Sequence, residues 1–446
     1  MMQKILLISF LLFVPFLSYG QTTVTLEEAI QLALENNYQL KQSLNNLDLA
    51  EYQTQSAKAD FLPSLSANFN GARGVGRQFI EEELAFEDRT TYRLNGGLNA
   101  SIDIFSGFRN IANLRATEAN ELSQEEFYQR LRETITFDTA SRYLNVMVNQ
   151  ELLRIAESNL EASSSQLEQI EAQVEVGSRP TVDLYNQEAI VANDELAVIQ
   201  QQNALSVSKA QLIRIMQEET IEDVEVSMEE VDEANLFPSE YSLNEMLEVA
   251  LQNRSDIRAQ EYEIEVNRQD IRIARANSLP SLSASAGISS AYFRDASSLN
   301  VPFSDQFFDQ RISRSFGINL SIPIFNNLNN RTNLQSSQIQ LRNSQLELQN
   351  IRFQVSEEVR QAYNDYQSLV QELESTEKAL IAAERAFETE QQRYEVGSTT
   401  LIELNQANAN FVSAQSERVQ TIYNFIFQEK LLDYFIGQLD ESIQLN

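Results

Sequence analysis

Histidine, cysteine and tryptophan are all absent from the 446 residues of this sequence. Without histidine, the chain lacks the most common general base and metal ligand, and serine triads that depend on an imidazole are excluded. Without cysteine, it has no thiol nucleophile and no disulfide, so cysteine usage says nothing about the redox compartment. Glycine and proline are scarce, at 12 and 7 residues, which is typical of a chain dominated by helices.

Positive charge is scarce as well. The sequence has 33 lysines and arginines against 65 acids, which gives a net charge of −32. Nucleic-acid binding needs clustered cations that neutralise phosphates, so this balance argues against it. The acids follow long helical patterns as solvated faces do, and they form no paired-acid motif and no metal-ligand spacing. We therefore expect no enzyme activity, no metal and no cofactor, and the alternative left open is an exported, carboxylate-dependent hydrolase.

The N-terminus has the pattern of a secretory signal peptide. Lys4 provides a positive start, Ile5 to Leu17 is an apolar stretch, and Ser18 and Gly20 are small residues suited to cleavage. The apolar stretch is shorter than the roughly 20 residues that a membrane-spanning helix needs. We expect residues 1–20 to be removed and the rest of the chain to be exported.

The remainder of the chain consists of two tandem repeats. The stretch "TLEEAIQLALENN" (25–37) resembles "SLNEMLEVALQNR" (242–254), and "AKADFLPSLSA" (57–67) resembles "ARANSLPSLSA" (274–284). Each copy is too long to be a solenoid unit, so two tandem copies favour an internal pseudo-twofold arrangement.

The repeat sets the predicted domain boundaries. We predict a first structural repeat over residues 21–217 and a second over 242–446, each with a helix, a β-hairpin and a long helical hairpin. Residues 218–241 form an acidic linker between them, which has ten acids and no lysine or arginine. A solvated linker is the simplest interpretation, and a binding element is the alternative.

Within each repeat the hydrophobic period changes in the same order. Residues 25–60 have a helical pattern, with Thr25 as the predicted N-cap and Glu28 completing a capping box. After Pro63 the period becomes two, which indicates a strand. A polar loop is predicted over about 75–90, and its counterpart over about 292–310, before a second strand in each repeat.

Four segments therefore have one apolar and one polar face. Their length and alternation are typical of membrane barrel strands with lipid on one side and water on the other, and a half-buried strand of a soluble sandwich is the alternative. The alternating apolar positions are Leu65, Ala67 and Phe69; Leu98, Ala100, Ile102 and Ile104; Leu282, Ala284, Ala286 and Ile288; Phe316, Ile318, Leu320, Ile322 and Ile324.

Long helical patterns follow the second strand of each repeat. The first runs from about residue 105 to Val176, which corresponds to roughly 100 Å at 1.5 Å per residue. The return helices carry apolar residues seven apart, a spacing that predicts left-handed supercoiling. These positions are Leu184, Val191, Val198, Leu205 and Leu212 in the first repeat, and Leu404, Phe411, Phe425 and Leu432 in the second, where Arg418 interrupts them.

Taken in this order, the motifs resemble those of the outer membrane factor family, the TolC-like channels. The distinguishing stretches are "LPSLSA" before each first strand, "SIDIFSGFRN" and "SIPIFNNLNN" where strand returns to helix, and "VGS" at each hairpin tip. The resemblance implies a mainly α fold with membrane β: a homotrimer in which four strands per chain close a 12-strand β-barrel, continued by an α-helical coiled-coil barrel. It also implies localisation in the outer membrane, contacting its lipid and extending into the periplasm.

The function implied by the resemblance is a passive exit duct of a tripartite efflux or type I secretion system, served by a periplasmic adaptor protein and an inner-membrane pump. The hairpin tips are then the adaptor-contact candidates, namely Val176, Gly177, Ser178, Val396, Gly397 and Ser398. Asp183 and Glu403 match positions where the family often places carboxylates facing the pore, although N-terminal-turn acids that complement a helix dipole are the alternative. Tyr394 and Arg179 are candidates for a closing latch.

A soluble periplasmic coiled-coil adaptor or holdase is the second interpretation. It accounts for the signal peptide, the acidity and the heptads. It leaves unexplained the four amphipathic strands at fixed positions of the repeat.

Overall fold

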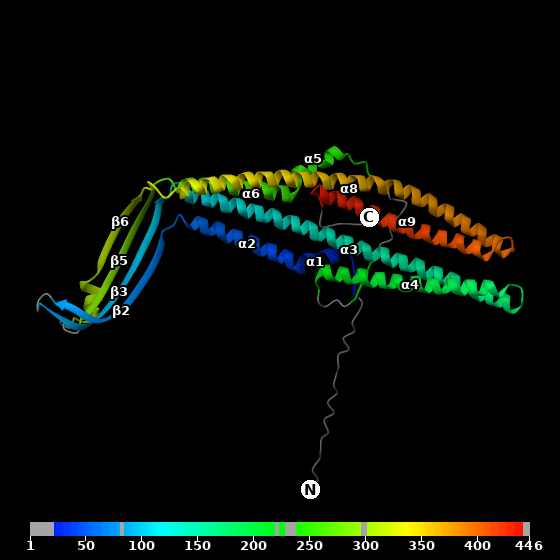
Figure 1. Cartoon of the computed structure of the whole chain (residues 1–446), viewed down its shortest axis with the longest axis horizontal. Helices are drawn as coiled ribbons and strands as arrows, with labels where there is room; N and C mark the ends of the chain where they lie inside the picture. Colours follow the sequence, from blue (N-terminus) through cyan, green and yellow to red (C-terminus); the bar gives the residue numbers. More distant parts are fainter. Residues whose placement is uncertain (1–21, 81–83, 219–222, 228–237, 296–300, 440–446) are drawn as a thin grey trace, which may run out of the picture.

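The computed structural model describes residues 22–80, 84–218, 223–227, 238–295 and 301–439. The predicted signal peptide, residues 1–20, lies outside the described residues. The molecule is elongated, with a β-sheet at one end and helices that run away from it to two hairpin tips at the other (Figure 1). None of the described helices is both long and apolar enough to cross a membrane.

The two halves of the chain share their long helices and strands in the same order, as the repeat predicts, and the second half also contains α7 and η2 between its strands. The long helices α3 and α8 each have 67 residues. The first half contains α1 (Leu26–Asn36), α2 (Tyr38–Ala59), β2 (Ser64–Ile80), β3 (Ala85–Phe105), α3 (Arg109–Glu175) and α4 (Thr181–Met216). The second contains α5 (Leu243–Asn253), α6 (Ser255–Ala276), β5 (Ser281–Asp295), α7 (Phe303–Asp305), the π-helical turn η2 (Gln306–Gln310), β6 (Ser313–Ser321), α8 (Asn329–Glu395) and α9 (Leu401–Phe435).

The first predicted helix is in fact two helices. Its capping box is present, because the Thr25 hydroxyl accepts from the Glu28 N–H and the Glu28 carboxylate accepts from the Thr25 N–H. The prediction of one continuous helix over 25–60 was wrong, since Asn37 leaves the helical conformation and its side chain caps α2 by accepting from the N–H groups of Gln39 and Leu40. Arg254 occupies the equivalent break between α5 and α6.

The four long strands form one antiparallel sheet in the order β2-β3-β5-β6. The predicted loop over 75–90 was wrong, because β2 continues to Ile80 and β3 starts at Ala85, with polar pairs such as Arg77 opposite Asp88. The second predicted loop is partly helical, and residues 296–300 within it lie outside the described residues. The strand predicted to reach Ile324 stops at Ser321, since Pro323 has no N–H to donate to a neighbour.

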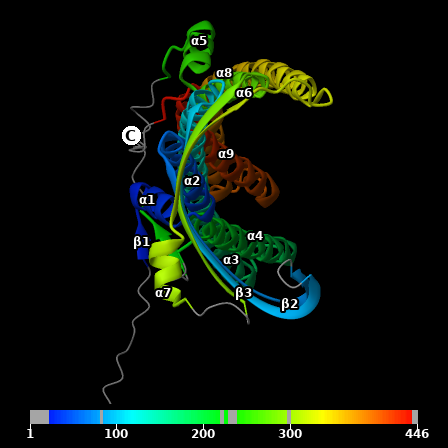
Figure 2. The ribbon, with the colours of Figure 1, turned by 90° about the vertical axis from the view of Figure 1, so that its left-hand side faces the viewer.

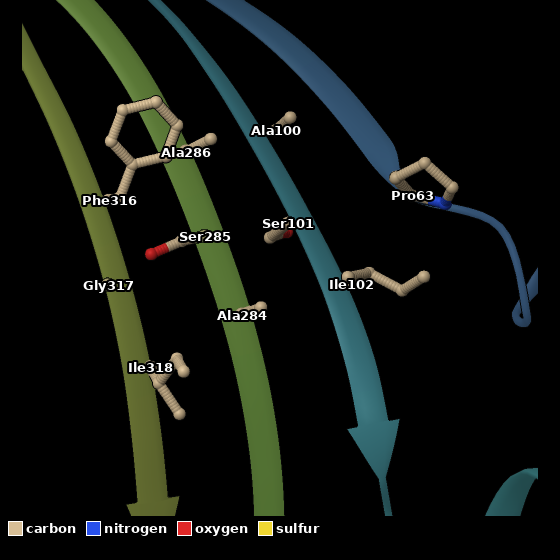
Figure 3. A pocket seen from close by; sticks show the side chains of 10 residues that line it. All are labelled: Pro63, Ala100, Ser101, Ile102, Ala284, Ser285, Ala286, Phe316, Gly317 and Ile318. Carbon is tan, nitrogen blue, oxygen red and sulfur yellow. The ribbon is translucent and has the colours of Figure 1, made fainter.

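The register gives the sheet one apolar and one polar face. Leu65 lies opposite Ala100, which lies opposite Ala286, which lies opposite Phe316. Figure 3 shows Ala100, Ala286 and Phe316 on three neighbouring strands. The next row contains only polar residues and glycine, namely Ser66, Asn99, Gly287 and Ser315.

The apolar face of the sheet is uncovered along much of its length. Phe316 is 86% exposed and Leu65 is 75% exposed. Within the described residues, the edge strands β2 and β6 each pair on one side only. Viewed from the sheet end, the strands form a curved layer (Figure 2). The layer is therefore curved, and within the described part of the chain its two edges have no neighbouring strand.

The helices pack as a wall in the order α2-α3-α6-α8, with α4 returning along α3 and α9 along α8 (Figure 1). Two hydrophobic cores lie midway along it, one around Met147 and Leu212 and the other around Tyr366 and Phe425. The wall is therefore held by central cores well away from the sheet.

A short parallel sheet attaches part of the acidic linker to the first core. Strand β1 (Thr22–Val24) pairs with β4 (Val224–Val226), whose Val224 is fully buried. The interpretation of this linker as solvated is therefore wrong for Val224 and Val226, while Asp223 and Glu225 are exposed and residues 219–222 and 228–237 lie outside the described residues. The alternation of Val224 and Val226 with Glu225 was the available sequence signal for β4.

Replacing Tyr143 with Phe is expected to lower the free energy of unfolding by about 1 kcal/mol. Tyr143 is 2% exposed, and its hydroxyl lies 3.1 Å from the Val24 carbonyl oxygen and 3.0 Å from that of Ser227. Thermal unfolding of the purified protein measures the effect. Tyr38→Phe is the control, because Tyr38 is exposed. Equal melting temperatures for the two variants would contradict the prediction.

Candidate functional site

The two hairpin tips lie at the end of the molecule farthest from the sheet (Figure 1). Gly177 and Gly397 have φ of +75° and +73°, a conformation that glycine adopts without strain. Ser178 donates its N–H to the Gln173 carbonyl at 2.8 Å, and Ser398 donates to the Arg393 carbonyl at 2.8 Å. Both tips are therefore the same Schellman turn, which satisfies the last carbonyls of α3 and α8.

The tips present an unobstructed surface. Val176 and Val396 are each 78% exposed. Apart from the glycine and its two chain neighbours, no atom of the described residues comes within 4 Å of a Cβ built on Gly177 or Gly397. Within the described residues, these two valines are therefore exposed apolar side chains at the tips.

A small hydrophobic cluster joins the two hairpins just behind the tips. Ile170 of α3 is buried against Tyr394 of α8 and against Leu401 and Leu404 of α9, with Leu184 of α4 packed on its edge. This cluster includes the first heptad position of each return helix, as the seven-residue spacing predicts. It fixes the tips relative to each other.

The structure brings together Arg179, Asp183 and Tyr394. The Arg179 guanidinium lies 4.2 Å from the centroid of the Tyr394 ring, and its Nη1 lies 3.6 Å from Oδ2 of Asp183. Burial raises the pKa of the Tyr394 hydroxyl, and the nearby positive charge of Arg179 opposes that rise. An aromatic of one hairpin is thus held by a cation of the other.

Glu403 lies apart from that group and completes the N-terminal capping box of α9. Its carboxylate accepts from the Thr400 N–H at 3.2 Å, and its own N–H donates to the Thr400 hydroxyl at 3.3 Å. Hydrogen bonds from the Thr399 hydroxyl and the Thr400 backbone lower the pKa of Glu403. The two predicted aperture acids therefore differ, because Asp183 is ion-paired and Glu403 is an exposed cap.

A groove lined by amide side chains runs behind the tips between α3, α4 and α9, and sequence reasoning missed it. Its cavity of about 820 Å³ is lined by apolar side chains such as Ile155 and Ile190 together with asparagines, of which Asn408 donates to Asn159 at 2.9 Å. Asp194 lines it, and burial raises the pKa of this carboxyl. Asparagines on all three helices were the available sequence signal. Among the described residues, no group of three or more histidine, cysteine or acidic side chains is placed to hold a metal.

Curated relatives of this chain include proteins of two bacteria. The chain is 27% identical to the pyoverdine export outer membrane protein OpmQ of Pseudomonas aeruginosa, over 68% of this chain and 61% of the relative. It is 27% identical to the cation efflux system protein CusC of Escherichia coli O157:H7, over 70% of this chain and 64% of the relative. The alignments thus span less than two thirds of the length of these relatives.

Solved structures share the fold over nearly the whole chain. A CusC crystal structure matches with a TM-score of 0.79 at 22% identity, covering 92% of each chain. The Campylobacter jejuni CmeC outer membrane channel matches with a TM-score of 0.80 at 17% identity, covering 96% of this chain and 92% of that one. The predicted fold class is therefore confirmed. A model of the outer membrane efflux protein family matches residues 29–217 and 246–437, and the chain belongs to this family.

Proposed function

We propose that this protein is the outer-membrane exit duct of a tripartite export system. The observation that carries the proposal is the open, curved sheet with one uncovered apolar face. Strand edges inside lipid leave backbone groups unsatisfied, so the sheet needs partners at β2 and β6. Three copies of a four-stranded sheet close a 12-strand barrel, with the serine and asparagine face toward a water-filled lumen and the apolar face toward outer-membrane lipid.

The helices continue the duct away from the membrane. A helix of 67 residues is about 100 Å long, which is enough to carry the lumen deep into the periplasm. At its far end, the exposed tip residues Val176, Gly177, Ser178, Val396, Gly397 and Ser398 receive a periplasmic adaptor protein, and an inner-membrane pump supplies energy and cargo. The duct itself is passive.

The residues behind the tips set the aperture. Three copies of Asp183 and Glu403 give the narrow end a negative field that favours cations. The contact between Arg179 and Tyr394 holds neighbouring hairpins in one arrangement and is our proposed closing latch. Opening of the aperture would separate Arg179 from Tyr394.

The relatives do not select one cargo. One is named for pyoverdine export and the other for cation efflux, at the same 27% identity. The cargo class therefore follows from the pump and adaptor that the duct serves, and the neighbouring genes would identify these.

Replacing Asp183 with Asn and Glu403 with Gln together should lower the cation preference of the channel by about twofold or more, because six acids leave the constriction of a trimer. Reversal potentials in a salt gradient measure the cation preference. Glu374→Gln is the control, since Glu374 is paired with Lys378 on the α8 surface far from the tips. A permeability ratio unchanged by the double variant would reject the aperture role.

Single-channel recording in a planar bilayer tests the duct. The account predicts stepwise, ohmic conductance from the purified protein, since a passive pore needs no energy source. A protein that remains in solution and produces no steps would instead support the periplasmic adaptor or holdase interpretation.

A further inference from the structure

A cavity of about 430 Å³ lies where the sheet meets the helices, between the first turns of α3 and the last turns of α6. The preceding turn is pressed against the end of α6, because a Cβ on Gly107 would lie 2.8 Å from the Ala276 carbonyl oxygen. Three arginines, Arg115, Arg272 and Arg275, line the cavity. This contact fixes the two helices around them.

The charge of this cavity is opposite to that of the chain. The net charge is −32, yet among the described residues none of the three guanidinium groups has a carboxylate within 4.0 Å. Arg275 lies in the last turn of α6, where a cation also complements the helix dipole. Arg115 lies in the second turn of α3, and the first turn of α3 has no acid. These arginines therefore favour an anionic ligand.

The cavity opens on the same side as the apolar face of the sheet. Arg109 lies 3.6 Å from Asp103, which lies opposite Ser283 on the polar face. At 100° per residue, Ile111 and Arg115 lie about 200° and 240° around α3 from Arg109, on the other side of the helix. In the wall, α3 and α6 lie between α2 and α8, so a neighbouring chain that docks at the sheet edges leaves the cavity accessible.

Exposed apolar side chains surround the arginines. Phe108 is 62% exposed, Ile111 is 44% exposed and Leu279 is 42% exposed, and all three line the cavity. They continue the apolar surface of the sheet, because the Phe108 ring lies 5.2 Å from the ring of Phe105, which lies opposite Leu282 on β5. A ligand that fits this surface has a negatively charged head and apolar chains that lie against the sheet.

We propose that this cavity binds the phosphate headgroup of an anionic phospholipid from the membrane leaflet nearer the helices. Guanidinium groups bind phosphate through paired hydrogen bonds, and basic pockets beside membrane segments bind lipid headgroups in this way. The proposal rests on the proposed function, because it requires the sheet to lie in a membrane. The positions of the first repeat that are equivalent to Arg272 and Arg275 hold Gln55 and Lys58, so the pair of arginines on α6 is not repeated on α2.

The absence of tryptophan permits a direct test. The variant Ile111→Trp places a single fluorophore at the cavity, and Ile318→Trp places one on the apolar face of the sheet. Each detergent-solubilised protein is titrated with phosphatidylglycerol or phosphatidylcholine that carries the same brominated acyl chains. We expect the fluorophore at position 111 to reach half-quenching at about tenfold less phosphatidylglycerol than phosphatidylcholine, and the fluorophore at position 318 to be quenched equally by both.

Charge variants in the Ile111→Trp background test whether the arginines cause the preference for phosphatidylglycerol. Changing Arg115, Arg272 and Arg275 to Gln should abolish the preference, changing them to Lys should retain most of it, and Lys58→Gln should leave it unchanged. Equal quenching by both lipids at position 111, with normal quenching at position 318, would overturn the lipid site and leave the duct standing. Loss of the preference with millimolar inorganic phosphate alone would show a free-phosphate site and overturn the lipid assignment. No quenching at position 318 would overturn the membrane sheet and the lipid site together.

Discussion

The double substitution Gly177→Trp with Gly397→Trp is expected to abolish export while leaving the protein folded in the membrane. Both glycines have positive φ, and space around each is open, so the new ring projects from the tip without displacing a neighbour. The backbone strain is about 1 kcal/mol per site, which a large protein tolerates. If an adaptor docks on Val176 and Val396, the rings should weaken docking by tenfold or more, or about 1.4 kcal/mol.

Export of a reporter cargo in cells measures the effect, beside the quantity of protein in the membrane fraction. Gly177→Ala with Gly397→Ala is the matched control, because it introduces the same strain without the bulk and should export normally. Gly437→Ala is the contrasting control. Gly437 also has positive φ, but a Cβ there would lie 3.2 Å from the Cα of Arg254, so this variant should lose stability instead. Normal export by the double tryptophan variant would remove the tips from the docking site.

The second large effect is expected at Arg254, which lies at the break between α5 and α6. Its side chain is 4% exposed, and it bonds Asp256 at 2.5 Å and Glu358 of α8 at 2.6 Å. Arg254→Met should lower the free energy of unfolding by about 3 kcal/mol, because it leaves the half-buried Asp256 carboxylate without its main partner. The expected loss of unfolding free energy is near the lower end of the range for breaking a buried ion pair, since Arg130 also lies 4.0 Å from Asp256.

The same ion pair makes stability depend on pH. Burial opposes the charged form of Asp256, but hydrogen bonding and charge from Arg254, with help from Arg130, lower its pKa below the ordinary value. A lowered pKa in the folded state stabilises the protein above the unfolded-state pKa of about 3.9, and that stabilisation is lost as pH falls through the folded value. The difference between wild type and Arg254→Met should therefore be large at pH 7 and shrink below about pH 4.

Thermal unfolding at pH 7 and below about pH 4 measures the difference in stability between wild type and Arg254→Met. Arg352→Met is the matched control, because Arg352 also bridges α8 to α6, through Glu261 at 2.7 Å, but both side chains are about half exposed. A surface pair of this kind should contribute less than about 1 kcal/mol. Equal losses in the two variants at pH 7 would show that the buried ion pair has no special contribution.

The architecture was predictable because the two repeats carry the same sequence pattern. Patterns of period two and of period seven recur at matching positions, so each weak local signal, such as the alternation around Leu65 or the glycine at 177, is supported by its copy. Asn37 and Arg254 were missed as helix breaks, since neither is a glycine or a proline and the hydrophobic period continues through both.

The site was only partly predictable. The tip glycines and the alternation of apolar residues identified backbone positions, which depend on local sequence. The contact of Arg179 with Tyr394 and the arginine-lined cavity near Gly107 join residues far apart in the sequence, so their geometry required the packed hairpins. The roles proposed for Asp183 and Glu403 remain predictions, because the structure places one in an ion pair and the other in a helix cap.

The measurement that tests the central claim most directly is the mass of the detergent-extracted particle by light scattering, beside a membrane fractionation. The account predicts a protein that stays in the outer membrane fraction without detergent and has three chains per particle, because only then do the edges of β2 and β6 close on each other. A water-soluble monomer or dimer in the periplasmic fraction would contradict it.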